Sequence, residues 1–133
     1  QPLSVLRGTA ASSENRPLAF TRVRSLSDLE SMIRTAGKPV LLDFYADWCV
    51  SCKEMERFTF ADPRVRARLA GWTLLQADVT ANSDADRSLL QRFGLYGPPG
   101  IIFFDAGGNE IKGVRVVGFQ SAEEFLSLLA RLG

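Results

Sequence analysis

Residues 40–53 read VLLDFYADWCVSCK, and this stretch decides the fold. It opens with an almost wholly apolar run, which is typical of a strand buried on both faces of a mostly parallel sheet. Asp43 is the one acid that interrupts the run. Helical sequence follows from Cys49 to about Phe60, so Cys49 and Cys52 stand where a buried strand gives way to the N-terminus of a helix.

The two cysteines form a C-x-x-C pair whose placement suits disulfide chemistry. We expect Cys49 in the exposed first turn of the helix, where unpaired N–H groups and the helix dipole stabilise a thiolate, and Cys52 one turn further in. The outer thiol would attack a disulfide and the inner one would resolve the mixed disulfide. A structural disulfide, a metal clip or two ordinary thiols are alternatives. So small a ring constrains the unfolded chain little, which favours reversible redox chemistry.

The rest of the chain alternates between strand and helix patterns around this stretch. Upstream, a short strand at 19–24 precedes a helix that Ser25 or Ser27 caps and Gly37 ends. Downstream we expect a helix at 62–70, a strand at 72–79, a helix around 89–93, a tight turn at 97–100, a hairpin of strands 101–105 and 111–117, and a last helix capped by Ser121. This order predicts an α/β fold with a central mixed β-sheet flanked by helices on both faces.

Composition limits the function before any family is considered. The 133 residues, 46% of them hydrophobic, suffice for one globular domain, which we place at 18–133 with a flexible leader or interdomain linker at 1–17. The 16 basic and 15 acidic residues nearly balance, so nucleic acid is not an expected partner. Absence of His excludes Cys-His and Ser-His catalysis, and no apolar run approaches the roughly 20 residues that cross a bilayer. We expect a monomeric domain without a metal site.

Residues 43–53 resemble the active-site segment of the thioredoxin family, including its buried acid ahead of the first Cys. The resemblance extends over 19–132, and Gly97-Pro98-Pro99 resembles the loop that carries the family's cis-proline, which would be Pro99. More narrowly, three segments are similar to the C-terminal periplasmic domain of the DsbD family of transmembrane reductases, namely 45–56, 59–60 and 76–82.

The resemblance implies a thioredoxin fold and a protein-disulfide reductase within a membrane electron relay. Such a domain accepts electrons from a membrane-embedded domain of the same parent protein and passes them to an amino-terminal periplasmic domain, in the service of disulfide isomerisation and cytochrome c maturation. It would be a periplasmic domain of a bacterial inner-membrane protein, act on protein disulfides and need no cofactor beyond the Cys49–Cys52 disulfide. A freestanding thioredoxin-like reductase and a C-x-x-C module that holds a soft metal such as Cu(I) are the alternatives.

Two acids are candidates to tune the cysteines. Asp43 is costly in an apolar strand unless it is used, so we expect a raised pKa and a role as general base toward Cys52, directly or through water. Glu56 follows Cys52 by one helical turn on the same face, where a solvated surface Glu is the ordinary interpretation. The resemblance, in which an acid at this place accompanies the buried Asp, supports a functional role for Glu56.

Partner binding is expected beside the cysteines. Trp48 is a candidate apolar contact, and the loop of Gly97, Pro98 and Pro99 would present an extended edge to which a substrate segment adds as a short strand. Pro98 has no N–H, so one backbone donor is missing from that edge. Gly100 stands where the family more commonly has Thr, which we expect to loosen the edge. These departures predict fewer backbone bonds and more selective docking.

Overall fold

The computed structural model describes residues 18–132, so the leader proposed for 1–17 lies outside the described residues. The described part contains a four-stranded sheet in the order β1 (Thr21–Arg22), β3 (Thr73–Asp78), β2 (Val40–Tyr45) and β4 (Gly100–Phe104). β3 pairs in parallel with both β1 and β2, whereas β4 runs antiparallel to β2. The sheet is therefore mixed, as the sequence predicts.

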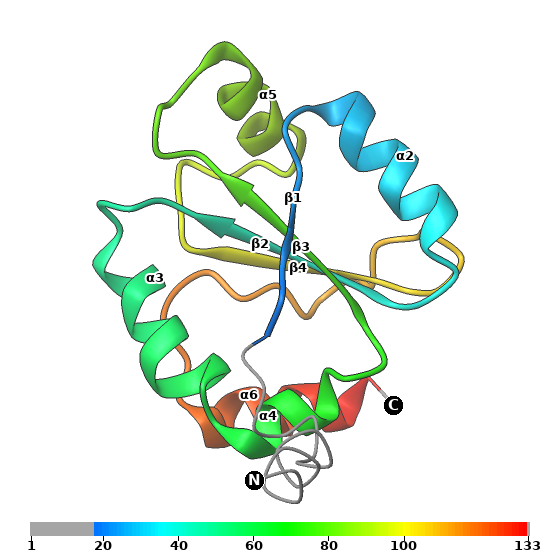
Figure 1. The fold of residues 1–133 in the computed structure, drawn as a ribbon, viewed down its shortest axis with the longest axis vertical. Helices are drawn as coiled ribbons and strands as arrows, with labels where there is room; N and C mark the ends of the chain where they lie inside the picture. The colour runs from blue at the N-terminus through cyan, green and yellow to red at the C-terminus, as the bar shows by residue number, and fades with distance from the viewer. Residues whose placement is uncertain (1–17, 133) are drawn as a thin grey trace, which may run out of the picture.

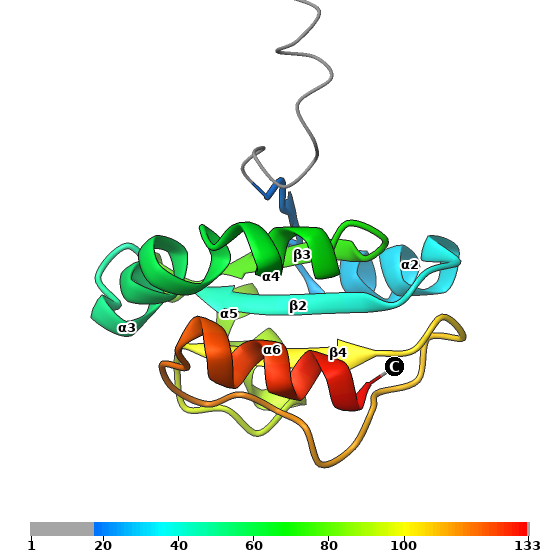
Figure 2. The same cartoon turned by 90° about the horizontal axis from the view of Figure 1, so that it is seen from below.

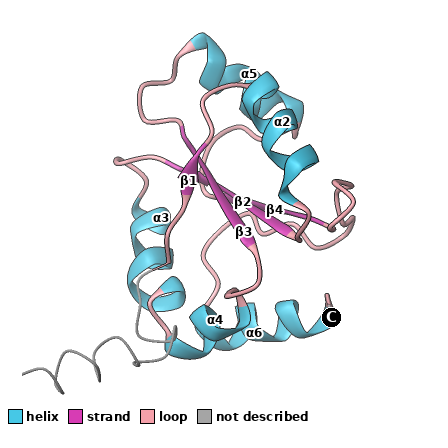
Figure 3. Cartoon of the chain, turned by 45° about the vertical axis from the view of Figure 1, so that its right-hand side comes forward, coloured by secondary structure: helices cyan, strands magenta, loops and turns pink. Residues whose placement is uncertain are grey.

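Helices cover both faces of the sheet (Figures 1 and 3). α2 (Leu26–Ala36) and α5 (Asp84–Arg92) lie on one side, and η2 (Met55–Phe60), α4 (Pro63–Arg68) and α6 (Ala122–Arg131) lie on the other. α3 (Val50–Glu54) leads from the end of β2 into the second layer. Figure 2, which looks at the molecule from below, shows α4 and α6 in front of the strands.

The core divides along the same two faces. Phe44 of β2 packs with Leu29 of α2 and Leu89 of α5, whereas Leu41 of β2 packs with residues of η2, α4 and α6. Every residue of β2 is buried, because helices cover both faces and a strand pairs along each edge. β2 is thus the centre of the fold, and the C-x-x-C pair follows directly from its carboxyl end.

Short-range sequence signals place the helix ends correctly. The Ser25 side chain accepts the N–H of Asp28 in the first turn of α2, and Gly37 ends this helix in the left-handed conformation with φ of 65°. Asp62 caps α4 in the same way. Ser121 and Glu124 form a reciprocal capping box at the start of α6. The structure confirms these helix ends. They could be predicted from sequence because each depends on residues only a few positions apart.

The second hairpin arm expected at 111–117 is wrong as a continuous strand. The segment makes only two isolated bridges, Ile101 with Val116 and Phe104 with Glu110. Between the two bridges, the β4 segment advances by three residues and the facing segment by six, so a regular ladder cannot form. Gly113 lies within the facing segment and adopts a positive φ of 81°, which favours glycine.

The helix expected from Cys49 to about Phe60 is present, but its last six residues, Met55–Phe60, form a π-helix. The Thr59 hydroxyl donates to the carbonyl oxygen of Gln120 at 2.5 Å, and the N–H of Gln120 donates to the sulfur of Met55 at 3.3 Å. The wider turn keeps Met55, Thr59 and Phe60 buried while Glu56 stays on the exposed side. A contact with the chain before α6 therefore accompanies this local departure from α-helix.

Candidate active site

Cys49 and Cys52 form a disulfide across the start of α3. Cys49 is the N-cap residue, with an extended backbone, and its sulfur accepts the N–H of Cys52 at 3.1 Å. The N–H of Cys49 in turn donates to the carbonyl of Ala46 at 3.1 Å, which closes a tight turn between β2 and the helix. The two Cα atoms lie 5.2 Å apart, within the range that disulfides span.

The disulfide is recessed rather than exposed. Cys49 is only 6% exposed, although the sequence analysis expects it in an exposed first turn. Its chain neighbours Trp48 and Val50 are 60% and 72% exposed, so two apolar side chains lie at the surface on either side of Cys49 in the chain. Burial of Cys49 follows from its N-cap position, where the turn from Ala46 folds it back toward the core.

The sulfur of Cys52 faces the interior. It lies 3.7 Å from the carbonyl oxygen of Phe44, in the last part of β2. In the reduced protein this oxygen is an acceptor for the Cys52 thiol. Cys52 is thus the inner cysteine of the pair, in the order that the sequence predicts.

Asp43 is buried in β2, one residue before that carbonyl group. Burial raises its pKa to about 8, which a hydrogen bond from the side-chain amide of Gln76 at 3.5 Å opposes and the negative charge of Glu56 reinforces. The raised pKa expected from sequence is therefore confirmed. At neutral pH the carboxyl group is largely protonated in the oxidised protein.

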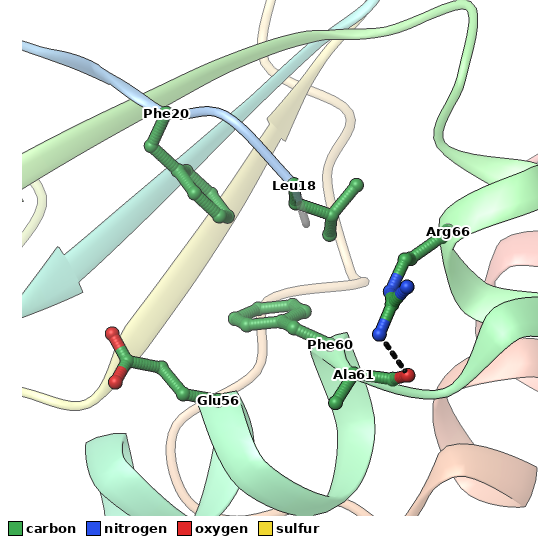
Figure 4. A pocket seen from close by; sticks show the side chains of 6 residues that line it. All are labelled: Leu18, Phe20, Glu56, Phe60, Ala61 and Arg66. Carbon is green, nitrogen blue, oxygen red and sulfur yellow. Dashed lines mark hydrogen bonds between the residues drawn. The ribbon is translucent and has the colours of Figure 1, made fainter. Parts of the chain in front are cut away.

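Glu56 lies on the exposed side of η2 and lines a pocket of about 230 Å³. Figure 4 shows its carboxylate and the Arg66 guanidinium on opposite sides of the Phe60 ring, with Phe20 above. Arg66 donates to the carbonyl of Ala61 at 2.6 Å. Glu56 reaches the site through its charge, which raises the pKa of Asp43.

A polar chain beside the cysteines was not expected from sequence. Lys53 donates to the phenol oxygen of Tyr45, and its ammonium group lies 5.0 Å from the centre of the Tyr45 ring. The phenol donates to Asp47 at 3.0 Å. This chain holds the cation of Lys53, the residue after Cys52. The hydrogen bond to Tyr45 raises the pKa of Lys53, and the charges of Glu56 and Asp47 add to this effect.

The proline loop closes the other side of the site. The peptide bond between Pro98 and Pro99 is cis, as the resemblance implies for Pro99. Gly97 and Pro98 line an open depression of about 630 Å³ together with Trp48, Gly94, Leu95, Tyr96, Arg115 and Val117. The structure therefore brings Trp48 to the same hollow as Gly97 and Pro98, although half the domain separates them in sequence.

The structure places Gly100 inside the sheet rather than on the exposed part of the proline loop. It is buried at the start of β4, opposite Phe44 of β2. A Cβ atom at Gly100 would lie 2.8 Å from a methyl carbon of Leu95, so the Leu95 side chain fills the space that a Thr would need. The glycine lets Leu95 pack against the strand next to the disulfide.

Thr80 is a site residue that the sequence analysis missed. Its backbone carbonyl accepts the indole N–H of Trp48 at 3.1 Å, and its hydroxyl accepts the N–H of Asp47 at 2.9 Å. The segment 76–82 carries part of the family resemblance, which marks the region but not the contact. Only the pairing of β2 with β3 brings Thr80 to the cysteines.

Within 18–132, no group of three or more His, Cys, Asp or Glu side chains is arranged to hold a metal ion. None of the helices in the described part of the chain combines the length and apolarity that crossing a bilayer requires.

A mixed sheet with a disulfide at the N-terminus of the helix after its central strand, next to a cis-proline loop, defines a thioredoxin-fold thiol-disulfide oxidoreductase. A family model for the thioredoxin-like domain matches residues 27–133. The crystal structure of the oxidised C-terminal domain of DsbD from Neisseria meningitidis superposes with a TM-score of 0.70 at 35% identity, and covers 84% of this chain and 98% of that domain. The chain belongs to the thioredoxin-like family and, within it, to the C-terminal domains of DsbD.

Curated relatives agree with this assignment. The thiol:disulfide interchange protein DsbD of Ralstonia nicotianae is 59% identical over 98% of this chain, and that of Cronobacter sakazakii is 53% identical over 92%. The matched region is 22% and 21% of those proteins, so the chain spans about a fifth of the relatives' length. A thioredoxin from Thermus thermophilus, 23% identical with a TM-score of 0.67, shares the fold. The chain acts by thiol-disulfide exchange.

Asp43→Asn should change the pH dependence of stability. The pKa of Asp43 is raised from 3.8 to about 8 in the folded protein. The free energy of unfolding of the wild type is therefore highest below pH 4, where Asp43 is protonated in both states, and it falls as the pH rises toward 8. An Asn cannot ionise. We therefore expect urea unfolding of the oxidised variant to show a stability advantage over wild type that grows across this interval to several kcal/mol, at about 1.4 kcal/mol per pKa unit.

The matched control is Glu30→Gln, because Glu30 is an exposed acid on α2. This control should leave the slope of stability against pH unchanged between pH 4 and pH 8. Parallel curves for wild type and Asp43→Asn would contradict the buried, protonated state of Asp43.

Glu56→Gln should lower the pKa of Asp43. Removing the Glu56 charge removes a cause that raises this pKa, although burial, the larger cause, stays. A decrease of roughly half a unit is expected for an exposed charge acting through a screened path. Titration of the Asp43 carboxyl carbon by NMR measures it. Glu54→Gln, an exposed acid two residues earlier in the chain, is the control and should leave the Asp43 titration in place.

Proposed function

We propose that this chain is the reductase domain of a membrane electron relay. It takes electrons from a membrane-embedded domain of its parent protein and passes them to the amino-terminal periplasmic domain of that parent. One observation carries the proposal: the chain is 59% identical to the DsbD of Ralstonia nicotianae over 98% of its length, whereas its identity to the freestanding thioredoxin of Thermus thermophilus is 23%.

The match of the family model to residues 27–133 supports the domain boundaries that we propose. We place the catalytic domain at 18–133 and interpret 1–17 as a linker to the rest of the parent protein. The whole unit would lie in the periplasm, at the outer face of the inner membrane. Its partners would be the two other domains of the parent, and the domain would act as a monomer.

The exchange runs through Cys49. In the oxidised domain, a thiolate of the donor attacks the Cys49 sulfur, and the Cys49–Cys52 bond breaks to leave a mixed disulfide and a Cys52 thiolate. The second donor thiol then displaces Cys49, so the donor leaves as a disulfide and the domain holds two thiols. Toward the acceptor the steps reverse, with Cys49 attacking and Cys52 resolving. Placement of Cys52 against the Phe44 carbonyl supports Cys49 as the sulfur that partners reach.

Asp43 donates a proton to Cys52 and removes it again during the exchange. Its pKa of about 8 lies close to the ordinary thiol value of about 8.5, so proton transfer between the two groups costs little free energy. When Cys52 leaves as a thiolate, protonated Asp43 supplies its proton, and when Cys52 must attack, the carboxylate takes the proton back. Glu56 assists by keeping the pKa of Asp43 high.

Partner segments would dock in the depression between Trp48 and the proline loop. Trp48 supplies an exposed apolar ring next to Cys49. Gly97, Pro98 and Pro99 supply an extended edge, on which Pro98 offers a carbonyl oxygen and no N–H. Side-chain contacts would therefore contribute more of the affinity than backbone bonds.

Trapping identifies the partners directly. Cys52→Ala should leave stable mixed disulfides on Cys49, because the resolving thiol is gone. In cells that express the parent protein with this substitution, non-reducing gels and mass spectrometry should recover disulfides from Cys49 to the amino-terminal or the membrane-embedded domain.

The matched control is Cys49→Ala, which retains only the inner cysteine and should trap little. A Cys49→Ser variant should lose reduction of protein disulfides altogether. Recovery of only unrelated thiol proteins on Cys52→Ala would contradict the relay and favour a freestanding reductase.

A further inference from the structure

Thr80, two residues after the end of β3, makes two hydrogen bonds to the turn that leads to Cys49. β2 and β3 are parallel, with Tyr45 opposite Asp78, so their carboxyl ends meet at the same edge of the sheet (Figure 1). The chain then continues from β2 through Asp47 and Trp48 to Cys49, and from β3 to Thr80. The N–H of Val79 donates to the carbonyl of Tyr45 at 2.8 Å, which extends the pairing up to Thr80.

The Thr80 hydroxyl is oriented by its own neighbours. It donates to a carboxylate oxygen of Asp78 at 2.5 Å, and the same oxygen accepts the N–H of Thr80 at 3.0 Å. With its proton committed to Asp78, the hydroxyl can use its lone pairs only as an acceptor, and it accepts the N–H of Asp47 at 2.9 Å. An N–H at the centre of the turn before Cys49 thereby finds its partner.

The carbonyl of Thr80 holds the other half of the turn. It accepts the indole N–H of Trp48 at 3.1 Å, while the Trp48 side chain stays 60% exposed. One edge of the indole is therefore bound and the rest of the ring is presented to solvent beside the disulfide. A ring fixed in this way loses less conformational entropy when a partner protein covers it.

We propose that Thr80 is a positioning residue for thiol-disulfide exchange with proteins, holding the Asp47–Trp48 turn so that a partner meets the Trp48 ring next to Cys49. The inference rests on the proposed role of Trp48 as a partner contact. Small disulfides need no such contact, so Thr80 acts on protein substrates and leaves the intrinsic reactivity of the cysteines alone.

Thr80→Val tests the hydroxyl with almost no change of volume, and Thr80→Ser restores it. Two reactions of the pre-reduced domain are compared, namely reduction of the disulfides of insulin and reduction of the small aromatic disulfide DTNB. Thr80→Val should slow insulin reduction about two- to tenfold, as expected for one lost hydrogen bond, and change the DTNB rate less than about twofold. Thr80→Ser should return the insulin rate to the wild-type value.

Hydrogen exchange provides the structural readout. The amide of Asp47 should exchange faster in Thr80→Val than in wild type, and at the wild-type rate in Thr80→Ser. Unchanged insulin reduction in a Thr80→Val protein with an unprotected Asp47 amide would overturn the proposal. So would equal slowing of insulin and DTNB, or a Thr80→Ser variant as slow as Thr80→Val.

A second variant covers the case in which Thr80→Val does not fold. Trp48→Phe keeps an aromatic ring but loses the N–H that Thr80 binds. It should reproduce the selective loss with insulin, and an unchanged insulin rate would overturn the proposal. Wild-type rates test the proposed reductase function, whereas ratios of variant to wild type test Thr80, so the two failures are distinguishable.

Discussion

Burial of β2 on both faces is the constraint on which the site depends. Helices cover the two faces and strands pair along both edges, so the strand has one well-defined position and one well-defined end. The chain leaves that end through a tight turn and enters a helix with Cys49 as its N-cap. A carboxyl group placed inside such a strand cannot be hydrated, and the pKa of Asp43 rises to about 8 for that reason. The same burial therefore positions the disulfide and raises the pKa of the acid that we propose as its proton donor and acceptor.

The electrostatics around the sulfurs are balanced rather than strongly positive. One backbone N–H, that of Cys52, reaches the Cys49 sulfur in the oxidised protein. Asp43 is buried in β2, where the charge of Glu56 helps to raise its pKa, and Lys53 is held in a chain with Tyr45 and Asp47. A dithiol is a better reductant when its thiolate is less stabilised, because the free energy of the reduced form is then higher relative to that of the disulfide. This arrangement suits a domain that gives electrons away.

Local sequence predicted much of this structure, and long-range contacts account for what it did not predict. Helix ends at Ser25, Gly37 and Ser121 depend on residues within one turn, and they were placed correctly. The apolar run with one acid gave both the buried strand and the raised pKa of Asp43. By contrast, the strand expected at 111–117 is broken by the turn at Gly113, whose effect depends on a register that periodicity does not reveal.

The site shows the same division. The cysteines and the cis-proline loop could be located from spacing and resemblance, because each is a short contiguous motif. Burial of Cys49 and the contacts of Thr80 could not, since the partners of Asp47 and Trp48 lie more than 30 residues away. Gly100 is explained only by the Leu95 side chain that packs against it. With Pro98 unable to donate and Gly100 buried, exposed apolar side chains dominate this region. Trp48 and Val50 flank Cys49 in the chain, and Tyr96 and Val117 line the same depression as Trp48. Apolar side chains discriminate between partners by shape, whereas backbone donors bind any extended segment, so in the docking mode that we propose the missing backbone bonds would increase selectivity.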